Sequence, residues 1–206
     1  MNEFTAHVAR VLQLPRPAMA LQGAGCAQRV APIAVRLGEP VTADLYIRGL
    51  DLLWSSTGQA DPDAATDLVR QLEEVPEVDA IEAQSPELYV FEAVETLTGA
   101  LRILVDADHE DAARQFTGCA SELAQVCDTV ADQHKKGLLG RPGPLLDPFS
   151  DAERSVREQT LTLLRDGGPT AETVAQIQAL SGARAAAIDE LIPRFAEQHG
   201  LTDRGA

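Results

Sequence analysis

The feature that most limits the fold is a run of apolar residues with helical spacing between residues 85 and 108. In SPELYVFEAVETLTGALRILVDAD, apolar residues recur every three or four positions over four turns: Val90, Phe91, Val94, Leu97, Leu101, Leu104 and Val105. Such a segment forms a helix that must bury one face against other elements. No alternating strand pattern occurs elsewhere, and β-branched runs are scarce. The sequence therefore predicts an all-α fold, a single-domain bundle of about eight helices.

Breaks in the helical pattern divide the rest of the chain. Pro32 lies inside one expected helix, where it predicts a kink or a split, and Gly182 could divide the last long helix. We expect one domain over residues 1–199, a Gly/Pro-rich loop at 134–150 and a flexible tail at 200–206. The expected helices before the loop cover about 3–13, 18–37, 43–58, 61–75, 85–108 and 109–133.

The segment ADLYIRGLDLLWSSTG, residues 43–58, is apolar on nearly every side when it is drawn as a helix. Its polar residues fall on one narrow stripe: Asp44, Arg48, Asp51 and Ser55. Asp44 precedes Arg48 by four residues, the favourable order for an ion pair on an exposed face. This pattern predicts a buried core helix, with Thr42 or Asp44 as its N-terminal cap and Gly58 at its end.

Charge is concentrated in one quarter of the chain. The net charge is −15, and residues 61–111 hold fifteen Asp or Glu against Arg70 and Arg102, a net charge of −13. Such a surface repels phosphates, so we expect no nucleic-acid binding, whereas a basic protein partner is compatible with it. No apolar run is long enough to span a membrane, and no secretory signal pattern begins the chain. We therefore expect a cytoplasmic protein, and the sequence leaves its oligomeric state open.

The sequence shows no pattern typical of a catalytic, metal or cofactor site. The three cysteines give no disulfide framework, and Cys119 and Cys127, eight residues apart, lack further ligands with metal-site spacing. We expect these two thiols to pack as small core groups. We predict no catalytic residues, no metal and no cofactor, and a non-catalytic role is favoured over an enzyme.

One stretch resembles a known family. CAQRVAPIAVRLGEPVTADLYIRGLDLLW, residues 26–54, is similar to the YjaG-like family of bacterial all-helical proteins of unknown function. The positions that carry the resemblance are Cys26, Gln28, Arg29, Pro32, Tyr46, Arg48, Leu50, Asp51, Leu52 and Trp54, with a weaker match around Glu95. Gln28 departs from the family, in which an acid is common. The resemblance implies an all-α cytosolic protein and supplies no activity.

Arginines on apolar helices need partners, because stripping water from a charge costs several kcal/mol. We predict that Arg29 or Arg48 pairs with Asp51, Glu95 or both. This set, with Tyr46 and Trp54, would form either a structural polar clamp or the floor of a pocket.

The sequence supports two candidate functions. The favoured one is a protein-interaction or regulatory module that uses the acidic face of residues 61–111. The alternative is a small-molecule-binding protein or enzyme with an anion pocket near Arg29 and Arg48.

Overall fold

The computed structural model confirms the all-α class. It describes residues 2–55, 61–79, 85–105, 108–139 and 148–205, with the backbone alone at 79 and 132–139. Within these ranges the chain forms a single bundle of helices and contains no strand. The helices are α1 (Glu3–Val11), α2 (Arg16–Leu37), α3 (Pro40–Ser55), α4 (Pro62–Leu72), the 3₁₀ helix η1 (Pro76–Asp79), α6 (Leu88–Val105), α7 (His109–Leu139), α8 (Pro148–Gly167), α9 (Ala171–Asp189) and α10 (Ile192–His199).

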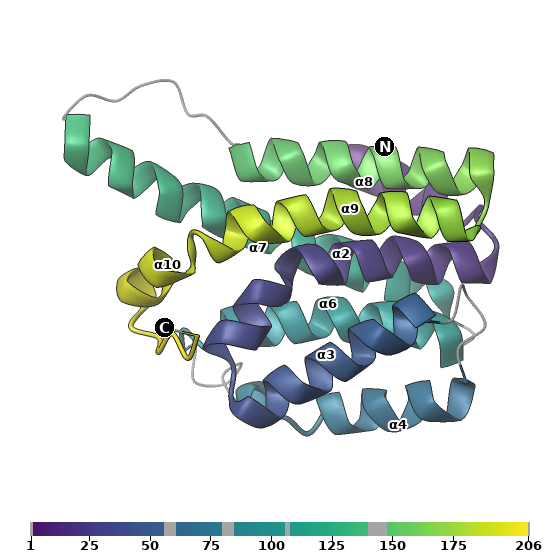
Figure 1. Ribbon diagram of the computed structural model, residues 1–206, viewed down its shortest axis with the longest axis horizontal. Coiled ribbons are helices and arrows are strands. Elements are labelled where there is room, and N and C mark those ends of the chain that lie inside the picture. The colour runs from purple at the N-terminus through teal and green to yellow at the C-terminus, as the bar shows by residue number, and fades with distance from the viewer. Residues whose placement is uncertain (1, 56–60, 80–84, 106–107, 140–147, 206) are drawn as a thin grey trace.

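Helices α2 and α6 form the centre of the bundle (Figure 1). Val90, Val94, Leu97, Leu101 and Leu104 of α6 are buried, as their spacing predicts. The close approach of α2 to α6 depends on small residues. A Cβ atom added at Gly23 would lie 2.6 Å from the Cβ of Ala100, so only glycine fits there. Helix α7 packs against α6 and also contacts α2, where Phe116 lies beside Gly23.

Prolines shape α2 as the sequence predicts. Pro15 is the N-cap residue and Pro17 lies in the first turn, where a missing N–H costs no helical hydrogen bond. Pro32 lies inside the helix and cannot donate to the carbonyl one turn earlier. Figure 1 shows the consequence, since α2 remains one helix but changes direction in its second half.

Helix α3 is amphipathic rather than a core helix, so the prediction of near-complete burial is wrong. Its buried residues, Thr42, Leu45, Tyr46, Gly49 and Leu53, form one face that packs on α2, α4 and α6. The polar stripe is exposed as predicted, but Val41 and Ile47 are also 53% and 47% exposed. The reason is position, because α3 lies at the edge of the bundle and no helix in the described residues covers its outer side.

The N-terminal ends of α3 and α4 are held by different contacts. Asp61 caps α4, because its side chain accepts a hydrogen bond from the backbone N–H of Asp63 at 3.0 Å. Thr42 is not a cap. It lies inside α3, and its hydroxyl donates to the buried carboxylate of Glu77 at 2.6 Å. That carboxylate also accepts from the N–H of Glu39 at 2.7 Å and so anchors the start of α3. Gly58 lies outside the described residues.

The C-terminal third contains more regular structure than the sequence predicts. Helix α7 continues through Leu139 and α8 begins at Pro148, so both ends of the expected loop at 134–150 are helical; residues 140–147 lie outside the described ranges. Helix α9 passes through Gly182 without a break. The expected tail is docked over its described part, since Asp203 binds Arg36 at 2.5 Å and Arg204 binds Glu39 at 2.6 Å. No described helix is both long and apolar enough to cross a membrane.

Candidate functional site

Two members of the predicted clamp lie on the surface. The side chain of Arg48 is 53% exposed and contacts Asp44 at 3.7 Å, the intrahelical pair that the spacing predicts. Asp51 is also exposed. The prediction that Arg48 pairs with Asp51 or Glu95 is therefore wrong, because the stripe that carries Arg48 and Asp51 faces away from the bundle.

The other members are separated from one another. Tyr46 is fully buried and its hydroxyl donates to the carbonyl of Ala27 at 2.8 Å, which fastens α3 to α2. Trp54 is half-buried beside the core. Glu95 lies between α6 and α7 and accepts from the amide of Gln115, and burial raises its pKa. Each of these three residues thus has its own surroundings, and none of them lines either of the two cavities described below.

Arg29 is the exception, because it is fully buried and paired. Its Nε and Nη2 donate to the two carboxylate oxygens of Glu153 on α8, at 2.6 and 2.8 Å. Gly25 makes room for the guanidinium, since a Cβ there would lie 3.2 Å from Nη1. Burial is the largest single effect and opposes the charge, but the Glu153 carboxylate, the Cys26 sulfur and the hydrogen bonds to both together outweigh it, so the pKa of Arg29 is raised. The buried clamp exists, with a partner that the sequence reasoning missed.

Arg157 lies one turn after Glu153 on the same face of α8 and is only 6% exposed. Its Nη1 donates to the hydroxyl of Ser121 on α7 at 2.8 Å. Among the described residues, no carboxylate lies within ion-pair distance of Arg157, and its Nε has no hydrogen-bond partner. A buried guanidinium with this little compensation is uncommon, because desolvation is costly unless a counter-charge is close.

A second arginine near this cluster is also poorly compensated. Arg184 of α9 lies over the ring of Phe149, with its guanidinium carbon 4.3 Å from the ring centre. Its Nε and Nη2 have no partner among the described residues, and burial lowers its pKa. The carboxylates of Glu153 and Asp128 both favour the charged form of Arg184, but in the described residues neither lies within ion-pair distance of its guanidinium.

A cavity of about 370 Å³ opens beside Arg157. It lies between the start of α1, the middle of α7 and the start of α8, and is lined by Asn2, Glu3, Phe4, Ser121, Gln125, Ser150, Glu153, Arg154 and Arg157. Arg154 and Glu3 are half-exposed lining residues, and Arg154 Nε lies 3.3 Å from Glu3 Oε1. The cavity therefore has a buried wall formed by Glu153 and Arg157 and a more exposed ion pair.

Helix α1 is fastened to α8 beside this cavity. The fully buried His7 contacts Glu158 through Nδ1 at 2.7 Å, and Arg10 binds the same carboxylate at 2.7 Å. Burial, with the nearby charge of Arg157, lowers the pKa of His7 to about 4. The imidazole is therefore neutral at physiological pH, and we infer that Nδ1–H donates to Glu158. These contacts position α1 as one wall of the cavity.

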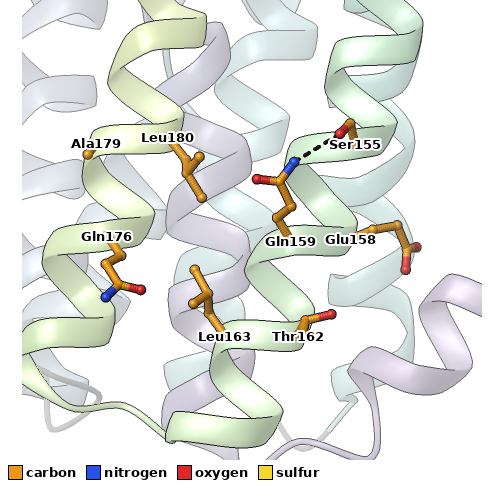
Figure 2. Close-up of a pocket in the computed structure, with 8 residues that line it drawn as sticks. All are labelled: Ser155, Glu158, Gln159, Thr162, Leu163, Gln176, Ala179 and Leu180. Carbon is orange, nitrogen blue, oxygen red and sulfur yellow. Dashed lines mark hydrogen bonds between the residues drawn. The ribbon is translucent and has the colours of Figure 1, made fainter.

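A second hollow, of about 710 Å³, runs between α8 and α9 (Figure 2). It is lined by Ser155, Glu158, Gln159, Thr162, Leu163, Gln176, Ala179 and Leu180. The side chain of Glu158 is its one charged group and is already bound by α1. Figure 2 also shows Gln159 donating to Ser155, at 3.0 Å. This open groove offers no buried polar group without a partner, so it specifies a ligand less well than the Arg157 cavity.

The residues missed at the sequence level are Glu153, Arg157 and Arg184. The signal for the first two was present, because Glu153, Arg157, Thr160, Leu161 and Leu164 share one helical face. A charge at two positions of an otherwise buried face indicates an internal ionic contact. The cysteines behave as expected for core groups. Cys127 is buried and Cys119 is partly buried, and burial raises the pKa of both thiols to about 12.

The comparisons with known proteins add no family. No family model matches the chain, and neither a curated protein nor a solved structure matches it. The resemblance of residues 26–54 to the YjaG-like family stays a prediction, and the function has to be argued from the site itself.

Proposed function

We propose that this protein binds a small anionic molecule in the cavity between α1, α7 and α8, with Arg157 as the residue that holds the negative charge. One observation supports this most strongly: Arg157 is 6% exposed, lines the cavity and has no carboxylate partner in the described residues. An anion in the cavity would offset the cost of desolvating this charge. Ligand pockets typically combine a concave surface with a few polar groups of this kind.

The proposal keeps part of the anion pocket expected near Arg29 and Arg48. Arg29 contributes indirectly, because it neutralises Glu153 and holds that carboxylate in the cavity wall. Arg48 does not contribute, since it lies on the exposed side of α3. The role is one of binding, because the cavity lining contains no paired nucleophile and base. We place this function in the cytoplasm, which suits a protein with free thiols at Cys26, Cys119 and Cys127.

The test is a thermal-shift titration with acetate and with inorganic phosphate at constant pH and ionic strength. A ligand of the native state raises the melting temperature with increasing concentration. We expect this rise in the unaltered protein and in Arg165→Gln, an exposed α8 arginine paired with Asp166. We expect no rise in Arg157→Gln. Equal shifts in all three proteins would mean that the anions act through general salt effects, and the proposal would fail.

A second candidate function is docking of a basic protein partner on the acidic face of residues 61–111. The supporting observation is the number of carboxylates there that are exposed: Asp61, Asp63, Asp67, Glu73, Glu74, Glu87, Asp108, Glu110 and Asp111. Both bases of this segment are already engaged, Arg70 with Asp67 and Glu74 and Arg102 with Glu73. Arg114 likewise pairs with Glu110. The carboxylates that form no ion pair with the described residues are Asp61, Asp63, Glu87, Asp108 and Asp111. Their negative charge is available to a partner, in keeping with a regulatory role and not with nucleic-acid binding.

Docking of this kind should weaken as salt screens the charges. A pull-down from lysate at low and high salt would test it, with the Asp63→Lys/Asp67→Lys variant beside the unaltered protein. Glu172→Lys, on the exposed surface of α9, is the control. Partners retained equally by the acidic-face variant and the control would contradict docking on this face.

A further inference from the structure

We propose that the ligand of the Arg157 cavity is a small zwitterion of the α-amino-acid type, with its carboxylate on Arg157 and its ammonium group near Glu153 and Glu3. This inference rests on the proposed function, because it assumes that an anionic group binds at Arg157. It goes further by naming the number of charges on the ligand and the residues that recognise each of them.

The charges of the cavity wall set the charge of the anionic group. The lining contains two cations, Arg154 and Arg157, and two carboxylates, Glu3 and Glu153. Glu3 is paired with Arg154, and Glu153 is paired with Arg29 from behind the wall. Arg154 is shared by Glu3 and Asp151, each 3.3 Å from it, so these three side chains leave one negative charge over. Arg157 leaves one positive charge over. A single carboxylate neutralises it, whereas a phosphate dianion would leave a negative excess in a partly buried site.

The donors of Arg157 suit a carboxylate. Its Nη1 is occupied by Ser121, its Nε is buried without a hydrogen-bond partner, and no hydrogen bond joins its Nη2 to the described residues. The Nε–Nη2 edge of a guanidinium binds the two oxygens of a carboxylate in parallel. The neighbouring Arg29 uses this same edge to bind Glu153. The ligand carboxylate would therefore repeat, on Arg157, a contact that the protein already makes one turn away on α8.

The two carboxylates beside Arg157 suit an ammonium group. Each oxygen of Glu153 accepts one hydrogen bond from Arg29, and a carboxylate has about four lone-pair sites, so both oxygens retain acceptor capacity. Glu3 adds a second negative charge, and its side chain is 63% exposed. The ring of Phe4 also lines the cavity and offers a face to a cation or an apolar side chain. A plain anion would gain nothing from these three residues.

The size of the cavity fits a small metabolite. Its volume of about 370 Å³ lies near the lower end of the range for ligand pockets, roughly 300–1,000 Å³. The side chains of Asn2 and Gln125 also line it and carry amide groups. The space and the lining thus suit a molecule with two charged groups and a short side chain.

The experiment uses the full chain and matched probes. The common L-amino acids are first compared by thermal shift, and the best one is then measured by titration calorimetry. It is compared with its N-acetyl derivative, which lacks the ammonium charge, with its amide, which lacks the carboxylate, and with acetate and inorganic phosphate. We expect each derivative to bind at least about ten-fold more weakly than the amino acid, because each loses one charged contact.

Two variants assign the two ends. In Arg157→Gln, the amino acid should lose affinity to the level of its amide. In Glu3→Gln, the preference for the amino acid over its N-acetyl derivative should shrink. Asp151→Asn is the control for Glu3→Gln, because Asp151 also contacts Arg154, at 3.3 Å, but does not line the cavity. It should leave that preference unchanged.

The outcomes separate the two proposals. If acetate, phosphate or the N-acetyl derivative binds as tightly as the amino acid and depends on Arg157, anion binding stands and the zwitterion inference is overturned. If no probe binds, or if binding ignores Arg157→Gln, both are overturned. If the Glu3→Gln and Asp151→Asn variants discriminate equally, Glu3 does not recognise the ammonium group and this part of the inference is wrong.

Discussion

Removing the carboxylate of Glu153 should strongly destabilise the protein. In Glu153→Gln, Arg29 remains buried and charged but loses its counter-charge. The side chains of Arg29 and Glu153 are 0% and 4% exposed, so water cannot replace the missing contact. Breaking a buried ion pair from one side costs about 3–5 kcal/mol. For a domain of this length, that corresponds to a fall in Tm of roughly 6–20 °C.

The double variant Arg29→Met/Glu153→Leu tests the physical reason. It removes both charges and fills the space with apolar groups, so no charge stays buried without a partner. Replacement of a buried pair by apolar residues is often neutral or stabilising, by about 1–4 kcal/mol. We therefore expect the double variant to be at least as stable as the unaltered protein and far more stable than Glu153→Gln.

Equilibrium urea unfolding followed by circular dichroism measures these free energies. The control is Asp44→Asn, which breaks the exposed pair with Arg48 by the same chemical change. Its effect should stay below about 1 kcal/mol, as for other surface pairs. A loss of the same small size in Glu153→Gln would refute the reasoning, and so would a double variant as unstable as the single one.

Three further predictions concern pH and packing. Burial, and then the nearby carboxylate of Glu122, raise the pKa of Glu92 to about 7, so the protein should lose stability as the pH rises from about 4.5 to 7. This loss should be absent in Glu92→Gln, so at pH 8 the variant should be about 1–2 kcal/mol more stable than the unaltered protein, after allowance for solvent screening. The pKa of His7 is lowered to about 4, so stability should fall as pH drops from about 6.5 to 4, and urea unfolding of His7→Gln across this range should lack that slope. Gly23→Ala should cost about 1–3 kcal/mol in urea unfolding, because its Cβ would meet Ala100, while Gly118→Ala, whose nearest atom is 4.0 Å away, should cost nothing.

The sequence predicts the local features of this fold well, because they depend on neighbouring residues. The helical spacing of α6, the Asp61 cap and the proline inside α2 are all decided within a few positions of the chain. The exposure of α3 could not be predicted in the same way. Periodicity shows which side of a helix is more apolar, but the burial of Ile47 depends on whether another helix covers it.

The candidate site was predicted only in part for the same reason. That Arg29 needs a partner follows from its apolar surroundings, but the choice of Glu153 follows from the packing of α2 against α8, 124 residues later. Arg48 had similar sequence surroundings and is exposed, because α3 lies at an edge. The extent of α7 was underestimated because glycine weakens a helix by about 1 kcal/mol without ending it.

The separation of Arg29 from Glu153 also bears on folding during synthesis. Ribosomes add about 5–20 residues per second, so the 124 positions between these residues correspond to roughly 6–25 s. During that interval the nascent α2 carries a cation in its apolar sequence with no counter-ion available from α8. We therefore expect the N-terminal helices to stay loosely associated and hydrated on the ribosome, and to form a dry core only after the second half of the chain has emerged.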